Sequence, residues 1–293
     1  MELDFVKLKE IKPALAEYIR ESQSLLKTSF APDEKAVHDV RVLMKKSRAV
    51  LSLAGPQLDR VSFNRDILAF RKIGRIMRLW RETSVHRKIL KEFRKEHPGI
   101  FSGLQENEKI VSLLKKIEHV YEPSEEIKTR LQEINDLLNK AGYRIRFQTM
   151  NKFDPQLLIK EFELTYTKVS DIYLICRNNP RPEKLHEFRK KAKDFLYQLL
   201  IFRPLNPSVV KALEKKLESM TQNLGKFNDL TQLVTVLDYN YKESKNLPAM
   251  DELIIKIRER QDRYLAKVWP SAYQIFCPDQ KLVNVLGFKL LVI

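Results

Sequence analysis

Two segments 148 residues apart repeat one arrangement of histidine, arginine and lysine at helical spacing. In VHDVRVLMKKSR, which begins at Val37, the histidine precedes an arginine by three residues and a lysine by seven. LHEFRKKAKDFLY, which begins at Leu185, has the same spacing. Since an α-helix turns by about 100° per residue, each segment forms a basic face with apolar residues opposite. The repeat predicts two amphipathic helices. In each, the apolar side packs in a core and the basic side is suited to bind anions.

The rest of the chain also has helical periodicity. Apolar residues recur at spacings of three and four, alternating β-branched runs are nearly absent, and only 7 of 293 residues are glycine. We therefore predict an all-α fold. Helix-capping residues stand at Asp33, Ser124, Asp154 and Asn206. The predicted helices are 4–28, 34–54, 60–82, 84–95, 106–119, 125–141, 155–178, 183–203, 208–224, 227–243 and 250–268.

The repeat extends beyond the histidine segments. MRLWRE, from Met77, and LGKFND, from Leu224, follow their histidines by nearly the same distance and have related patterns. Each histidine segment also follows a long predicted helix. The duplicated unit spans about 140 residues, which is typical of a helical bundle rather than a short solenoid repeat. We predict a single domain, 1–293, with an N-terminal half, 1–150, and a C-terminal half, 151–293.

Positive charge is concentrated in the first half. The chain has 54 Lys and Arg against 38 Asp and Glu, a net charge of +16. Residues 37–97 contain 16 basic residues and only 6 acidic ones. This balance favours a polyanionic partner, such as nucleic acid, polyphosphate or anionic lipid.

The cysteines and the hydropathy pattern predict an intracellular protein. Cys176 and Cys277 are too few for a disulfide framework, which fits a reducing cytosol. The first residues lack a continuous apolar core, and no segment reaches the length of apolar residues that a membrane span needs. We expect a cytoplasmic protein with no membrane span.

A second basic stripe follows the first histidine segment. Arg71, Arg75 and Arg78 are four and three residues apart on one predicted helix. If this helix packs beside the histidine helix, both stripes line a groove where arginine forks and lysine ammonium groups meet phosphate oxygens. The alternative is a solvated helix face, but such faces usually mix acids with bases.

The histidines and carboxylates offer little for catalysis. His38 and His186 have no second histidine or carboxylate at metal-ligand spacing on the same helix. A simpler role for each histidine is to cap its helix. Near bound anions their charged form would be favoured, so binding should tighten at mildly acidic pH. Glu82 and Asp229 hold equivalent positions, where ion pairs or hydrogen bonds are more typical than metal ligation. We expect no cofactor, no metal and no nucleophilic catalysis.

The duplicated histidine helix, the MRLWRE and LGKFND segments, the length and the all-α pattern together resemble the CHAD domain, the conserved histidine α-helical domain. The resemblance covers nearly the whole chain. It implies two four-helix bundles related by pseudo-twofold symmetry, with a basic channel or groove that binds inorganic polyphosphate without catalysis. It also implies association with polyphosphate granules. Some relatives carry a triphosphate-tunnel domain, whose Glu-x-Glu-x-Lys strand has no match here, so we expect a stand-alone module.

The resemblance also implies which residues bind. In the second half Asp194 and Leu196 replace Lys46 and Arg48, and Glu218, Gln222 and Gly225 replace the arginines of the second stripe. We expect the first half to hold the anion more strongly. The predicted polyphosphate-binding residues are His38, Arg41, Lys45, Lys46, Arg48, Arg71, Arg75, Arg78, His186, Arg189, Lys190, Lys193, Tyr197 and Lys226.

Two other functions also fit the sequence. Unspecific binding to the backbone of RNA or DNA also suits a basic helical face, although no helix-turn-helix, zinc finger or aromatic strand motif is present. A phosphohydrolase or phosphotransferase would require metal-dependent release of phosphate.

Overall fold

Three of the four predicted capping residues begin helices in the computed structural model. The side chains of Asp33, Asp154 and Asn206 each accept a hydrogen bond from a backbone N–H of the following turn, at 2.6, 2.8 and 3.3 Å. These bonds satisfy N–H groups that have no partner inside the helix. The fourth, Ser124, lies outside the described residues.

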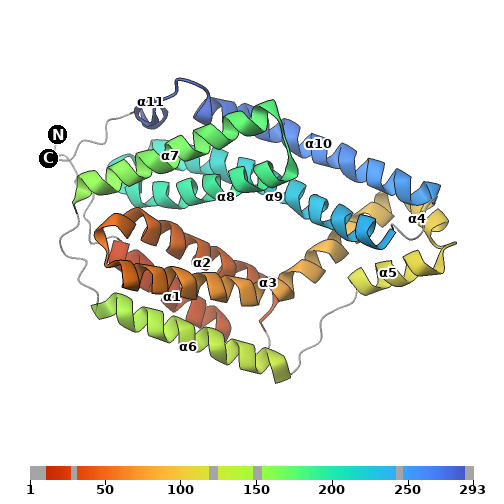
Figure 1. Cartoon of the computed structure of the whole chain (residues 1–293), viewed down its shortest axis with the longest axis horizontal. Helices are drawn as coiled ribbons and strands as arrows, with labels where there is room; N and C mark the ends of the chain where they lie inside the picture. Colours follow the sequence, from red (N-terminus) through yellow and green to blue (C-terminus); the bar gives the residue numbers. More distant parts are fainter. Residues whose placement is uncertain (1–10, 28–31, 119–124, 148–153, 242–246, 288–293) are drawn as a thin grey trace.

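The structure describes residues 11–27, 32–118, 125–147, 154–241 and 247–287, and every regular element in these ranges is helical (Figure 1). The predicted all-α fold is confirmed for this part of the chain. None of the helices described is long and apolar enough to cross a membrane. The elements are α1 Ile11–Lys27, α2 Glu34–Ala54, η2 Gly55–Gln57, α3 Arg60–Glu96, α4 Pro98–Leu104, α5 Glu108–Glu118, α6 Glu125–Phe147, α7 Pro155–Asn178, α8 Pro182–Leu199, η3 Leu200–Leu205, α9 Pro207–Tyr241, α10 Pro248–Phe276 and α11 Leu282–Leu286.

Several predicted helix bounds are wrong: α6 and α10 continue to Phe147 and Phe276 rather than ending at 141 and 268, and the short helices α4 and α11 were not predicted. Two further helices run through breaks that the sequence pattern predicts. The break expected at residue 83 is wrong, because α3 continues through it to Glu96. The break expected at 225 and 226 is also wrong, because Gly225 lies inside α9. A Cβ atom there would be 3.0 Å from the Nη2 of Arg189, so the missing side chain makes room for a guanidinium group rather than ending the helix.

The helices contact one another in two groups. In the first, α1 packs on α2, α2 on α3, and α6 on both α1 and α3; in the second, α7, α8, α9 and α10 pack in sequence and α10 returns to α7. The groups meet where α2 packs against α7 and α8. Figure 1 shows α3 and α9 extending past this region toward α4, α5 and α10. The pseudo-twofold relation between two bundles stays a prediction.

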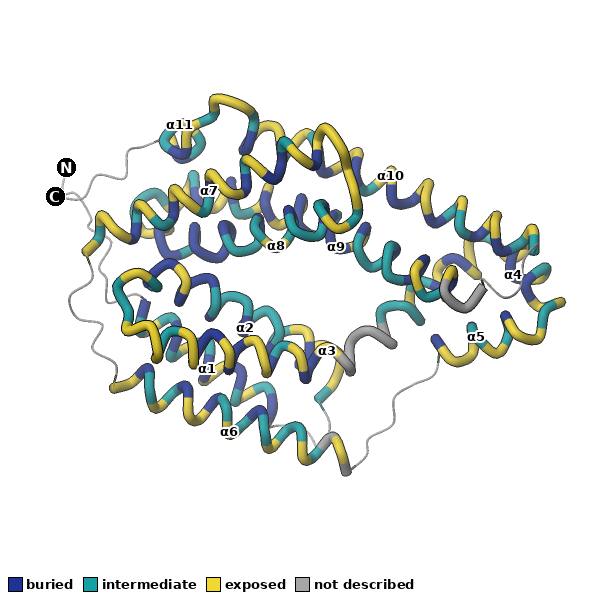
Figure 2. Tube along the Cα trace, in the orientation of Figure 1, coloured by how far each residue is buried: buried dark blue, intermediate teal, exposed yellow. Residues whose placement is uncertain are grey.

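The apolar faces of the helices form two clusters of buried side chains. The larger cluster contains residues of both groups, from Ile11 to Leu286, and includes the predicted core faces of α2 and α8. The smaller cluster joins the last turns of α3 and α9 to α4, α5 and α10. Figure 2 shows the buried residues along the inward sides of the helices. Removal of this apolar surface from water stabilises the arrangement of the long helices.

Two ion pairs join α3 to α6 in different environments. Asp66 of α3 is fully buried, and the Nε of Arg144 donates a hydrogen bond to its Oδ1 at 2.6 Å. Burial raises the pKa of Asp66, although Arg144 opposes this effect. The Lys72 pair with Glu133 is exposed, with 53% and 37% of the two side chains accessible. The Asp66 carboxylate therefore depends on its partner much more than Glu133 does.

We predict that Arg144→Met lowers the free energy of unfolding by about 3 kcal/mol, because it leaves a buried carboxylate without its counterion. Lys72→Met, which breaks the exposed pair between the same helices, should cost less than about 1 kcal/mol. Chemical denaturation of both variants measures the difference. Adding Asp66→Asn to Arg144→Met should recover part of the loss. Equal losses for the two single variants contradict this account.

Candidate anion-binding site

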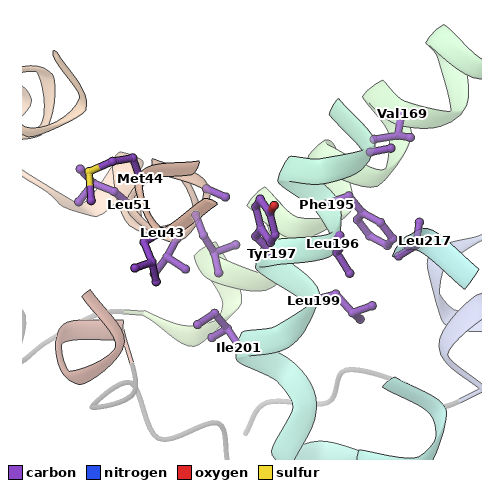
Figure 3. Close-up of a cluster of buried hydrophobic side chains, with 14 of the residues drawn as sticks. Leu43, Met44, Leu51, Val169, Phe195, Leu196, Tyr197, Leu199, Ile201 and Leu217 are labelled. Atoms are coloured by element: carbon purple, nitrogen blue, oxygen red, sulfur yellow. The ribbon is translucent and has the colours of Figure 1, made fainter. Parts of the chain in front are cut away.

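The two histidine helices pack against each other through their apolar and aromatic side chains. Tyr197 of α8 is only 5% exposed and points toward α2, where Leu43 and Met44 lie (Figure 3). The Nε2 of Gln198 donates a hydrogen bond to the backbone oxygen of Ala49 at 3.1 Å, which ties α8 to α2 directly. Two segments 148 residues apart in the chain thus share one interface.

The arginine of each histidine segment fixes its helix to the next one. Arg41 donates from Nη1 to the backbone oxygen of Gly74 in α3, at 2.7 Å. Arg189 donates from Nε to the backbone oxygen of Thr221 in α9, at 3.2 Å. When the MRLWRE and LGKFND segments are aligned, Gly74 and Thr221 are equivalent positions. The two bonds therefore repeat the same contact, and they place the two halves in register.

The basic side chains of α2 and α8 lie close enough to affect one another's proton affinity. Lys45 of α2 helps to lower the pKa of His186 in α8, and Lys46 of α2 helps to lower that of Lys193. Arg48 and Arg71, on consecutive helices, also interact electrostatically. We call the following group the α2–α8 basic cluster: Lys45, Lys46, Arg48, His186, Arg189, Lys190 and Lys193.

Three members of this cluster, Arg48, His186 and Lys193, bind their protons less tightly than usual in the ligand-free protein, and burial is the largest cause for each. Burial lowers the pKa of Lys193 to about 8, and Arg189 acts in the same direction. Burial also lowers the pKa of His186, with Lys190 and Arg189 adding to the effect and a hydrogen bond with Asn228 opposing it. Burial and the neighbouring bases thus both disfavour the charged forms of these side chains in the free protein.

The other predicted site residues occupy the borders of this cluster. His38 is exposed in the second turn of α2, whereas His186 is partly buried, so the two histidines have different surroundings. Arg75 and Arg78 are exposed on α3, one and two turns beyond Arg71. Lys226 lies on α9 with its ammonium 5.5 Å from the ring centre of Tyr264. Tyr197 is a core residue beneath Lys193, whose ammonium lies 5.5 Å from its ring centre.

Three partners in the site were not predicted from the sequence. Thr221 and Gly74 contribute only backbone oxygens. Every residue has one, so the residue type does not indicate this contact. Asn228 belongs to the LGKFND segment, so its place at a fixed distance after His186 was the available signal. The side chain of Glu82, which was predicted to be equivalent to Asp229, lies outside the described residues. Among the described residues, no group of three or more metal-ligand side chains is present.

We predict that Lys193 makes stability depend on pH. The unfolded chain keeps this proton up to the ordinary pKa of 10.5, whereas the folded protein releases it near pH 8. Folded protein therefore binds fewer protons between these values, so the contribution of Lys193 to stability is unfavourable below pH 8 and improves as pH rises. Urea unfolding at pH 7 and pH 9 measures this effect. From pH 7 to pH 9, the free energy of unfolding should change more favourably for the wild type than for Lys193→Met.

A matched control for this experiment is Lys215→Met, which removes an exposed lysine from α9. This variant should show the same difference in unfolding free energy between pH 7 and pH 9 as the wild type. The account is wrong if Lys193→Met also preserves it.

Comparison with known proteins gives a family match. A search of curated proteins finds no match to the chain. The family model for the CHAD domain matches residues 11–238, which include both histidine helices, α3 and most of α9. The α2–α8 basic cluster lies entirely within the matched region. The chain therefore belongs to the CHAD domain family.

Proposed function

We propose that this protein binds inorganic polyphosphate, without catalysis, at the α2–α8 basic cluster. The observation that carries the proposal is the approach of two basic helix faces, whose ammonium and imidazole groups have lowered pKa values at Lys193 and His186. Such a site gains free energy when an anion compensates its charge. Membership of the CHAD family, which is associated in general with polyphosphate binding, supports the same ligand class.

The mixture of side chains suits a flexible chain of phosphates. The arginines present forked donors in a fixed plane, whereas the lysines provide mobile point charges. The guanidinium groups of Arg41 and Arg189 each donate to a backbone oxygen of the helix that follows. These two arginines thus hold the histidine helices to α3 and α9 beside the basic cluster.

The arginine stripe of α3 extends the site in one direction. Arg71 is coupled electrostatically to Arg48, and Arg75 and Arg78 continue along α3 over about 10 Å. A linear polyanion that binds the α2–α8 basic cluster can therefore continue along α3. This arrangement supports the expectation that the first half contributes more to binding than the second.

Binding should also take up protons. A phosphate beside His186 and Lys193 favours their charged forms and so raises both pKa values from the lowered values of the free protein. Affinity should then increase as the pH falls from about 8 toward 6.

We further propose a cytoplasmic location in association with polyphosphate granules, in keeping with this ligand.

We predict that affinity rises steeply with phosphate chain length and falls with salt. Several weak contacts along one chain act together, and each contact releases counterions. Calorimetric titration with orthophosphate, tripolyphosphate and a long polyphosphate, at two salt concentrations, measures both effects. Equal affinity for orthophosphate and long polyphosphate contradicts the proposal.

Two double variants test which half binds more strongly, and each removes two exposed positive charges. Arg71→Gln with Arg75→Gln should weaken binding of the long polyphosphate more than Lys190→Gln with Lys226→Gln does. All four side chains are exposed, so both variants should keep the fold. An equal or opposite ranking would overturn the asymmetry.

Competition separates polyphosphate from nucleic acid. Long polyphosphate should displace RNA and DNA at a much lower concentration of phosphate groups, because the cluster presents charges to phosphates and no base-reading element. Displacement in the opposite order would favour nucleic acid as the ligand. Release of orthophosphate from polyphosphate in the presence of Mg²⁺ would contradict the non-catalytic assignment.

A further inference from the structure

Two acidic side chains occupy positions that are basic in the first half. The bonds of Arg41 to Gly74 and of Arg189 to Thr221 set the register of the two halves. In this register Asp194 of α8 corresponds to Lys46 of α2, and Glu218 of α9 corresponds to Arg71 of α3. Charge is therefore reversed on both helices of the second half, at positions that border the α2–α8 basic cluster.

Asp194 interacts with bases from both halves. It directly follows Lys193 on α8, one turn after Lys190, and is only partly exposed. The bases that favour its charged form are, in order of effect, Arg48 of α2, then Lys191, Lys190 and Lys45, while burial acts against them and raises its pKa. A carboxylate in this position compensates part of the charge that α2 presents to an anion.

Glu218 acts on the other side of the cluster. It lies one turn before Thr221, whose backbone oxygen receives the Arg189 hydrogen bond. Its carboxylate favours the charged form of Lys193 and disfavours the ionised form of Tyr197, which places it near both side chains. Glu218 is exposed, so it faces any ligand that approaches Lys193 from solvent.

We propose that Asp194 and Glu218 are affinity-limiting counterions that direct the polyanion to the α2–α3 side of the site. This inference rests on the proposed function and deepens it. On the α8–α9 side, a phosphate has to compete with a carboxylate for Lys193 and approaches a like charge. On the α2–α3 side, the equivalent positions are Lys46 and Arg71, so the phosphates meet additional positive charge instead.

A simple stabilising role for these acids predicts a different result. If Asp194 and Glu218 served only to pair with neighbouring bases in the folded protein, their replacement would lower stability and leave anion affinity unchanged apart from net charge. The counterion role instead predicts a gain of affinity that depends on position. The two roles therefore differ in a binding measurement.

The test compares Glu218→Gln with Glu259→Gln. Each raises the net charge by one, but Glu259 is on α10, where it pairs with Lys256 outside the cluster. Glu218→Gln should tighten binding of a long polyphosphate by about two- to fivefold, the effect of one partly exposed charge interaction, and Glu259→Gln should not. Glu218→Arg, which introduces the residue type of position 71, should tighten binding further. Equal affinities of Glu218→Gln and Glu259→Gln overturn the inference.

Two more measurements keep the result interpretable. Wild-type protein is titrated first: absence of binding overturns the proposed function and this inference with it, whereas binding that Glu218→Gln leaves unchanged overturns the inference alone. The gain in polyphosphate affinity from Glu218→Gln should be smaller when Lys193 is also replaced by Gln, because Glu218 and Lys193 interact electrostatically. An undiminished gain contradicts the pairing. Asp194→Asn repeats the test on α8, with thermal unfolding as the check of its fold.

Discussion

The contact between α2 and α8 brings two basic helix faces together, although like charges repel one another. Apolar packing around Tyr197 and the Gln198 hydrogen bond to Ala49 hold this contact. Burial, with smaller contributions from the nearby bases Arg189 and Lys46, lowers the pKa of Lys193 to about 8. Core packing thus maintains an electrostatically unfavourable cluster, and a bound polyanion can relieve it.

The arginines of the histidine segments connect this cluster to the helices that follow. Arg41 and Arg189 donate to equivalent backbone oxygens, so each guanidinium sets the position of a neighbouring helix as well as a local charge. Gly225 belongs to the same arrangement, because a side chain there would meet the Arg189 guanidinium. The register that results makes the reversed charges at Asp194 and Glu218 comparable, position by position, with Lys46 and Arg71.

Periodicity and capping residues were enough to predict where the long helices lie and the core faces of α2 and α8, but not the short helices α4 and α11. The unbroken course of α3 and α9 was not predicted, because a polar stretch near residue 83 and the glycine at 225 resemble helix ends when tertiary contacts are unknown. The sequence also indicated the basic stripes, but not the burial of Tyr197 or the proton affinity of Lys193. Both depend on neighbours that are distant in the chain, and no local pattern reports them.

Lysine footprinting tests the central claim most directly. Acetylation of the folded protein, with and without long polyphosphate, is mapped residue by residue by mass spectrometry. The account predicts protection of Lys45, Lys46 and Lys193 by the polymer, strongest at Lys45 and Lys46 of α2, and no protection of Lys116 on α5 or Lys256 on α10. Protection of Lys116 and Lys256 to the same degree as the α2–α8 lysines, or no protection at Lys45, Lys46 and Lys193, would contradict it.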